Sequence, residues 1–116
     1  MTIRTRRKNG IARLSLDGEL TIYQAVKLRD RLLESLRNCV EIDVNLSRVS
    51  EIDTAGVQVL MLVKREALAA GKPMRLVAHS AATLEAFDLF NLGGYFGDPM
   101  VLGPRSDSSD AKSTTP

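Results

Sequence analysis

The sequence predicts a single α/β domain in which a mixed sheet of four to five strands carries helices packed mainly on one face. Its 116 residues suffice for one packed core. The dipeptide Asn9-Gly10 lies between two strand-like segments and indicates a tight hairpin. Residues 40–78 have the pattern of a strand, a helix and a second strand, which is the order of a parallel βαβ unit.

Residues 3–8 and 11–16 alternate between apolar and polar side chains, as half-buried strands do. Asn9 and Gly10 both tolerate the positive φ angles of a two-residue turn. Asp17-Gly18 is expected to end the second strand, because both residue types favour turns. The N-terminal segment therefore predicts an antiparallel hairpin.

A helix is predicted over residues 22–37. Thr21 and Gln24 have the spacing of a capping box, which satisfies N–H groups at a helix start. Four residues at helical spacing form the stripe that should face the core, namely Ala25, Leu28, Leu32 and Leu36.

The central strand is predicted over residues 40–46 and is followed by a polar turn at 47–51. Asp53 then has the side chain of a helix N-cap, which places Thr54 in the first helical turn. Gly71 and the proline two residues later end this central helix. A phosphate on the Thr54 hydroxyl would meet unpaired N–H groups and the positive end of the helix dipole.

The central helix carries two apolar stripes. The core-facing stripe comprises Gly56, Val59, Leu60, Val63 and Ala67. A second stripe comprises Val57, Met61 and Leu68. Two interpretations stay open: the helix is wedged deeply between the sheet and another helix, or the second stripe is an exposed surface for a partner protein. The adjacent Thr54 hydroxyl favours the second.

The C-terminal part predicts a strand over residues 74–78 and a helix over 81–91 capped by Ser80, followed by a short strand at 99–102. Beyond it, the segment GPRSDSSDAKSTTP contains no apolar residue larger than alanine, so it cannot form a core. We therefore expect a domain over residues 1–102 and a disordered tail over 103–116.

Composition narrows the classes of function. The net charge of +2, from 16 basic and 14 acidic residues, predicts no nucleic-acid partner. The basic cluster of Arg4, Arg6, Arg7 and Lys8 is interpreted as a charged sheet edge, with a minor phosphate-binding role as the alternative. The single cysteine, Cys39, excludes an intramolecular disulfide.

Neither a signal-peptide pattern nor a membrane-length apolar run is found, so we expect a cytoplasmic protein without direct membrane insertion. Gly93-Gly94 follows a predicted helix and does not form a phosphate cradle, and we expect no cofactor. His79, the only histidine, has no marked catalytic partner and is expected at the solvent side or bracing a loop. The sequence therefore predicts no enzyme.

Four carboxylates lie near predicted strand-to-helix junctions, namely Asp17, Glu19, Glu51 and Asp53. Because such residues also form ordinary turns and N-caps, we predict no metal site. A small-molecule-binding protein or minor enzyme that uses the acids near Asp17 and Asp53 stays open as a further hypothesis.

Three motifs resemble the STAS domain, the family of bacterial anti-sigma factor antagonists. They are LDGELTI at residues 16–22, NLS at 45–47 with IDTAGV at 52–57, and FDLFNL at 87–92. The resemblance covers residues 3–102 and implies the STAS fold. The Asp-Thr-x-Gly junction at Asp53 to Gly56 is the most specific of these motifs.

The resemblance implies that Thr54 is the phosphoacceptor of a partner serine/threonine kinase, often itself the anti-sigma factor, and that a phosphatase reverses the mark. It assigns partner binding to the surface of the junction and the following helix, and we place six residues on it: Asp53, Thr54, Gly56, Val57, Met61 and Thr21. The resemblance thus implies a non-catalytic module of signal transduction and transcription regulation, while the nucleotide belongs to the kinase.

Three residues depart from the family pattern. Thr54 replaces the commoner serine, Ala55 replaces a second Ser/Thr, and Asn45 stands where the family often has Asp. Some relatives accompany chemotaxis kinases, and others are subunits of lipid-transport complexes. The alternative function is therefore a constitutive accessory subunit of a lipid-transport or signalling complex that is not phosphorylated.

Overall fold

The structure is a computed structural model that describes residues 1–90. Its elements are β1 (Thr2–Lys8), β2 (Ile11–Leu20), α1 (Ala25–Arg37), β3 (Glu41–Ile52), α2 (Thr54–Ala69), β4 (Met74–His79) and α3 (Ala81–Leu89). The described strands form one sheet in the order β1-β2-β3-β4, with β1 antiparallel to β2 and the other neighbours parallel. The predicted mixed sheet is confirmed.

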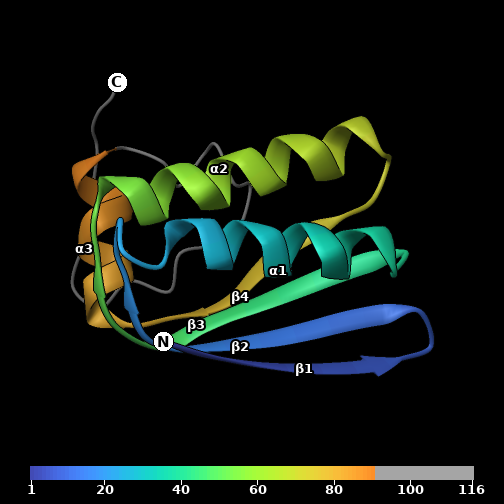
Figure 1. The fold of residues 1–116 in the computed structure, drawn as a ribbon, viewed down its shortest axis with the longest axis horizontal. Coiled ribbons are helices and arrows are strands. Elements are labelled where there is room, and N and C mark those ends of the chain that lie inside the picture. The colour runs from blue at the N-terminus through green and yellow to red at the C-terminus, as the bar shows by residue number, and fades with distance from the viewer. Residues whose placement is uncertain (91–116) are drawn as a thin grey trace.

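The helices lie mainly on one side of this sheet. Figure 1 shows α1 and α2 side by side over one face, with α3 at the end of the sheet where both helices begin. Leu14, Leu16, Ile42 and Val44 point from the two central strands into the layer between sheet and helices and are almost fully buried. The predicted packing of helices on one face is confirmed.

The hairpin and the predicted edge are both confirmed. Asn9 and Gly10 have φ angles of 55° and 82°, as a two-residue turn that follows the sheet twist requires. β1 lies at the end of the sheet among the described strands, and Arg4, Arg6 and Lys8 are exposed along it. Charged side chains on such an edge oppose aggregation.

Both parallel central strands are longer than the sequence predicts. β2 does not end at Asp17, because irregularities between Ser15 and Asp17 and between Gly18 and Glu19 allow pairing to continue to Leu20. β3 likewise runs through residues 47–51, so the predicted polar turn there is wrong. Tertiary pairing and the burial of Val49 override the local preference for a turn.

The helix starts and ends differ slightly from the predictions. α1 begins at Ala25, three residues after the predicted start, because residues 21–24 form a turn closed by the Gln24 N–H and the Thr21 carbonyl oxygen at 2.9 Å. Leu28, Leu32 and Leu36 are buried as predicted. Ser80 caps α3 in a reciprocal capping box with Thr83.

Other predictions lie partly or wholly outside the described residues. They are the end of the third helix at residue 91, the stop at Gly93-Gly94, the strand at 99–102 and the tail at 103–116. Among residues 1–90, no helix combines the length and apolarity needed to cross a bilayer.

Candidate partner-binding site

The junction between β3 and α2 is fixed to the junction between β2 and α1 by one carboxylate. Asp53 Oδ1 accepts the backbone N–H of Gly56 at 3.0 Å, which is the predicted N-cap bond. Asp53 Oδ2 accepts the N–H of Ile22 at 3.0 Å, and the Asp53 N–H donates to the Leu20 carbonyl oxygen at 3.2 Å. Two connections that are distant in the sequence are therefore held together at one end of the sheet.

Thr54 is the first residue of α2, and its side chain is exposed. The Asp53 cap satisfies the Gly56 N–H, whereas the N–H groups of Thr54 and Ala55 precede the first intrahelical hydrogen bond. The hydroxyl thus lies at the positive end of a helix of 16 residues. The location predicted for Thr54 is confirmed.

Gly56 packs directly against the end of β2. A Cβ atom at this position would collide with the Leu20 carbonyl oxygen and would lie 2.9 Å from Cγ1 of Ile52. A backbone atom cannot move aside as the tip of a flexible side chain can. Gly56 is therefore a close-approach position and, being buried, does not itself present a partner-binding surface.

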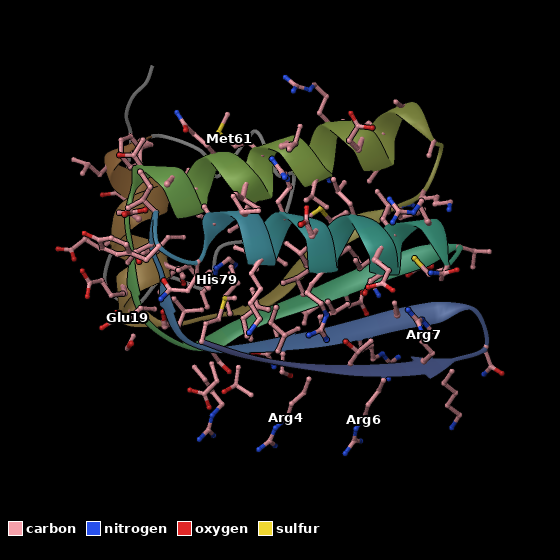
Figure 2. All side chains as sticks on the ribbon, in the orientation of Figure 1. Arg4, Arg6, Arg7, Glu19, Met61 and His79 are labelled. Atoms are coloured by element: carbon pink, nitrogen blue, oxygen red, sulfur yellow. The ribbon has the colours of Figure 1, made fainter. Side chains whose placement is uncertain are left out.

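The predicted exposed stripe on α2 needs correction. Val57 is only 3% exposed and belongs to the core, so its assignment to an exposed apolar strip is wrong, and the wedged interpretation holds there. The outward face instead carries Thr54, Gln58 and the half-buried Met61, at helical spacing. Figure 2 shows Met61 on the side of α2 away from the sheet.

Leu68 is the third residue of the second stripe that the sequence predicted. It is exposed but lies 14 residues after Thr54, roughly 21 Å farther along the helix. The surface around Thr54 therefore does not extend along the apolar stripe that the sequence suggested.

Thr21 supports the loop and does not offer a free hydroxyl. Its side chain is only 8% exposed, and its Oγ1 donates to Gln24 Oε1 at 2.7 Å. The Thr21 N–H donates to the same oxygen at 3.3 Å. The structure thus corrects the partner-contact assignment of Thr21: the residue shapes the turn that precedes α1.

The sequence did not identify an exposed apolar patch formed by Ile22, Tyr23 and Val26. These side chains are 66%, 91% and 60% exposed, and the patch adjoins the site because Ile22 is bonded to Asp53. The predicted helix began at Ile22, and no residue before Ala25 was assigned to its core-facing stripe. Tyr23 and Val26 lie one position off that stripe. This offset was the sequence signal that could have predicted their exposure.

On its other side, Thr54 borders an open cleft of about 670 Å³ between the end of β3 and α3. Glu51, Glu85 and Asp88 also line this cleft. Thr54 therefore lies between the apolar patch and an acidic cleft.

The four acids proposed for a small-molecule or catalytic site do not form a single cluster, although Glu19 and Glu51 are neighbours on adjacent strands. Asp17 pairs with Arg48 at 3.0 Å, Asp53 is occupied by backbone N–H groups, and Glu19 lies opposite Glu51 in the strand register. In residues 1–90, no group of three or more His, Cys, Asp or Glu side chains is placed to hold a metal ion.

His79 was expected at the solvent side or bracing a loop, and the solvent-side alternative is wrong. Both of its ring nitrogens are shielded from solvent, and its ring packs edge-on against Phe87 with the ring centroids 5.7 Å apart. The residue serves packing between the end of β4 and α3.

Comparisons with known proteins agree with this architecture. The family described as "Mlab, STAS domain" matches residues 3–102. None of the curated proteins matches the chain. Among solved structures, unphosphorylated SpoIIAA, an anti-sigma factor antagonist, has a TM-score of 0.70 at 20% identity, over 86% of this chain and 90% of that one.

Two further structures share the fold. The phosphorylated form of the Bacillus SpoIIAA has a TM-score of 0.66 at 20% identity, over 86% of this chain and 93% of that one. An anti-sigma factor antagonist from Mycobacterium paratuberculosis has a TM-score of 0.75 at 22% identity, over 86% of each chain. With the family match over residues 3–102 and the same fold in anti-sigma factor antagonists, this chain belongs to the STAS domain family.

Proposed function

We propose that this protein is a non-catalytic, cytoplasmic regulatory module that binds a partner protein through the surface around Thr54. A partner serine/threonine kinase, either an anti-sigma factor or a signalling or chemotaxis-linked kinase, phosphorylates Thr54, and a phosphatase reverses the mark. The observation that carries the proposal is the exposed Thr54 hydroxyl at the N-terminus of α2, beside the exposed apolar patch.

The junction can accept a phosphate without unfolding. The N–H groups of the first turn and the helix dipole favour a negative group at this position. Thr54 makes no contribution to the buried core, and Asp53 holds the backbone on either side of it. Phosphorylation adds about −1.5 to −2 charges at neutral pH. We therefore expect the modified protein to keep its fold.

The same charge would change docking. A partner that covers the apolar patch also removes water from Thr54. The patch adjoins Thr54 because the Ile22 N–H is bonded to Asp53, the residue before Thr54. Desolvating a phosphate beside Ile22 and the half-buried Met61 is costly unless the partner supplies cations in matching positions. Phosphorylation should therefore weaken binding to the partner that recognises the unmodified protein.

One observation favours the alternative, a constitutive accessory subunit of a lipid-transport or signalling complex that uses the same surface without phosphorylation. Glu51, Glu85 and Asp88 line the cleft beside Thr54 and would repel a phosphate. The two functions differ in whether Thr54 is modified, and both require a stable partner.

Intact mass of the protein purified from its native cells, together with whatever copurifies in stoichiometric amount, tests the proposal. We expect a fraction of the protein molecules to carry the added mass of one phosphate. This added mass should be absent in Thr54→Ala. It should be retained in the control Ser50→Ala, which removes another exposed hydroxyl of the same cleft. A stoichiometric partner with an unmodified chain under all growth conditions would select the accessory subunit instead.

A further inference from the structure

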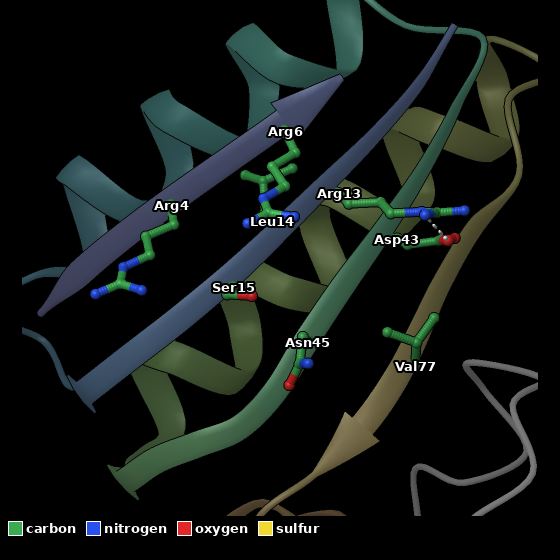
Figure 3. A pocket seen from close by; sticks show the side chains of 8 residues that line it. All are labelled: Arg4, Arg6, Arg13, Leu14, Ser15, Asp43, Asn45 and Val77. Carbon is green, nitrogen blue, oxygen red and sulfur yellow. Dashed lines mark ion pairs between the residues drawn. The ribbon is translucent and has the colours of Figure 1, made fainter. Parts of the chain in front are cut away.

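The sheet face opposite α1 and α2 carries a second, positively charged surface. Figure 3 shows Arg4 and Arg6 on β1 and Arg13 on β2 beside Ser15 and Asn45, on the face with the helices behind it. The side chains enclose a shallow hollow of about 460 Å³. This surface is separate from Thr54, which lies at the end of the sheet.

Acidic residues neutralise only part of this surface. Asp43, which is 5% exposed, accepts from Arg75 at 3.0 and 3.1 Å and pairs with Arg13 at 3.7 Å. Glu41 also pairs with Arg75, at 3.2 Å. Within residues 1–90, neither Arg4 nor Arg6 forms an ion pair. Two guanidinium groups therefore point into solvent with no carboxylate of the described chain beside them (Figure 2).

The backbone of β1 is also available along this edge. In a two-residue hairpin the residues that flank the turn, here Lys8 and Ile11, exchange hydrogen bonds, and bonded and non-bonded pairs then alternate. The N–H and C=O groups of Ile3, Thr5 and Arg7 consequently point away from β2. No described strand pairs with them, since β1 ends the sheet order.

We propose that the β1 edge binds an acidic, extended segment of a partner protein as an added strand, with alternate carboxylates of that segment over Arg4 and Arg6. Residues two apart on a strand are roughly 6.6 Å apart, which is also the spacing of same-face carboxylates on the incoming strand. Main-chain hydrogen bonds to Ile3, Thr5 and Arg7 would supply affinity, and the arginines would select the acidic pattern.

Other occupants fit less well. A second copy of this chain paired along β1 would bring Arg4, Arg6, Arg7 and Lys8 close to the same four cations. An anionic lipid surface would use the positive charge but not the free backbone groups. Val77 is the one exposed large apolar side chain among the residues that line the hollow, so little apolar area is available for insertion.

The probe is a short capped peptide that alternates Glu with Thr or Val, added to the full chain labelled for NMR. We expect binding that slows hydrogen exchange of the Ile3, Thr5 and Arg7 amides, while those of Arg4 and Arg6, already bonded to β2, change little. Arg4→Glu combined with Arg6→Glu should weaken affinity about tenfold. Arg37→Glu combined with Arg65→Glu, an equal charge change at exposed positions of α1 and α2, should leave it unchanged.

A second peptide carries N-methyl groups on the residues whose backbone N–H groups would bond to β1. The methyl groups remove these donors and leave the charge of the peptide unchanged. We expect this peptide to lose binding. Equal binding of both peptides, or exchange protection without the alternating pattern, would reduce the surface to nonspecific electrostatic attraction and overturn the proposal. Binding to phosphatidylglycerol-containing vesicles without binding to the first peptide would replace the protein partner with a membrane and also overturn it.

Discussion

Asp53 joins two segments that are 31 residues apart, because each of its carboxylate oxygens accepts a different backbone N–H. Asp53→Ala removes both acceptors and should lower the free energy of unfolding by about 1–3 kcal/mol. Asp53→Asn keeps one acceptor and should cost less. Urea denaturation measures this order of stability, with Asp30→Ala as control because, within residues 1–90, Asp30 pairs only with Arg29, at the surface. Equal stability of all three variants would contradict the role given to this carboxylate.

Gly56 offers a test in which two effects have opposite signs. Helix propensity alone predicts that Gly56→Ala stabilises α2 by about 1 kcal/mol. The added Cβ would instead collide with the Leu20 carbonyl oxygen, and overpacking of this kind costs about 1–3 kcal/mol or more. We expect a net loss of stability in denaturant melts. A variant as stable as the wild type, or more stable, would show that α2 does not approach β2 this closely.

Single-residue predictions succeeded where local chemistry decides the outcome. The Asp53 cap depends on the first turn of the helix, and the predicted core stripe of α2 is buried. Val57 was misassigned because a helical wheel gives the direction of a side chain but not what packs against it. The exposure of Ile22 was missed because it follows from the late start of α1, which the turn at Thr21 and Gln24 fixes.

At the scale of elements, the sequence predicted the order and type of the helices and strands better than their lengths. The hairpin and the βαβ unit rest on strong signals, namely Asn9-Gly10 and the change from period 2 to helical spacing near Asp53. The polar segment at residues 47–51 resembles a turn in isolation. It is a strand because β2 continues beside it, and a pairing between distant segments cannot be read from a local window.

The connection between β2 and α1 should contribute directly to partner affinity. Ile22→Ser removes an exposed apolar side chain beside Asp53, whereas Leu68→Ser removes one of nearly equal exposure, 67% against 66%, toward the far end of α2. We expect Ile22→Ser to weaken binding of the copurified partner about tenfold and Leu68→Ser to have no effect. Neither change should lower the melting temperature. Equal loss from both variants would move the interface away from Thr54.

At the scale of the whole molecule, the two candidate surfaces are physically separate. Thr54 and the apolar patch lie at the end of the sheet where α1 and α2 begin, while Arg4 and Arg6 lie on the face that these helices leave uncovered. A partner at one surface therefore leaves the other accessible. Variants of Arg4 and Arg6 should not alter binding at Thr54.

The C-terminal segment should be dispensable for stability. Residues 105–116 contain one alanine and no larger apolar side chain, so their removal takes nothing from the core. We expect a chain that ends at residue 104 to melt at the same temperature as the full chain. A substantial drop in that temperature would show that the segment docks on the domain.

Calorimetric titration of the copurified partner with wild type, Thr54→Ala and Thr54→Glu tests the switch most directly. The carboxylate of Thr54→Glu imitates part of the phosphate charge at the start of α2, where the side chain is exposed, so circular dichroism should not change. We expect wild type and Thr54→Ala to bind with similar affinity and Thr54→Glu to bind at least about tenfold more weakly. Equal affinity of all three proteins would contradict a switch at Thr54.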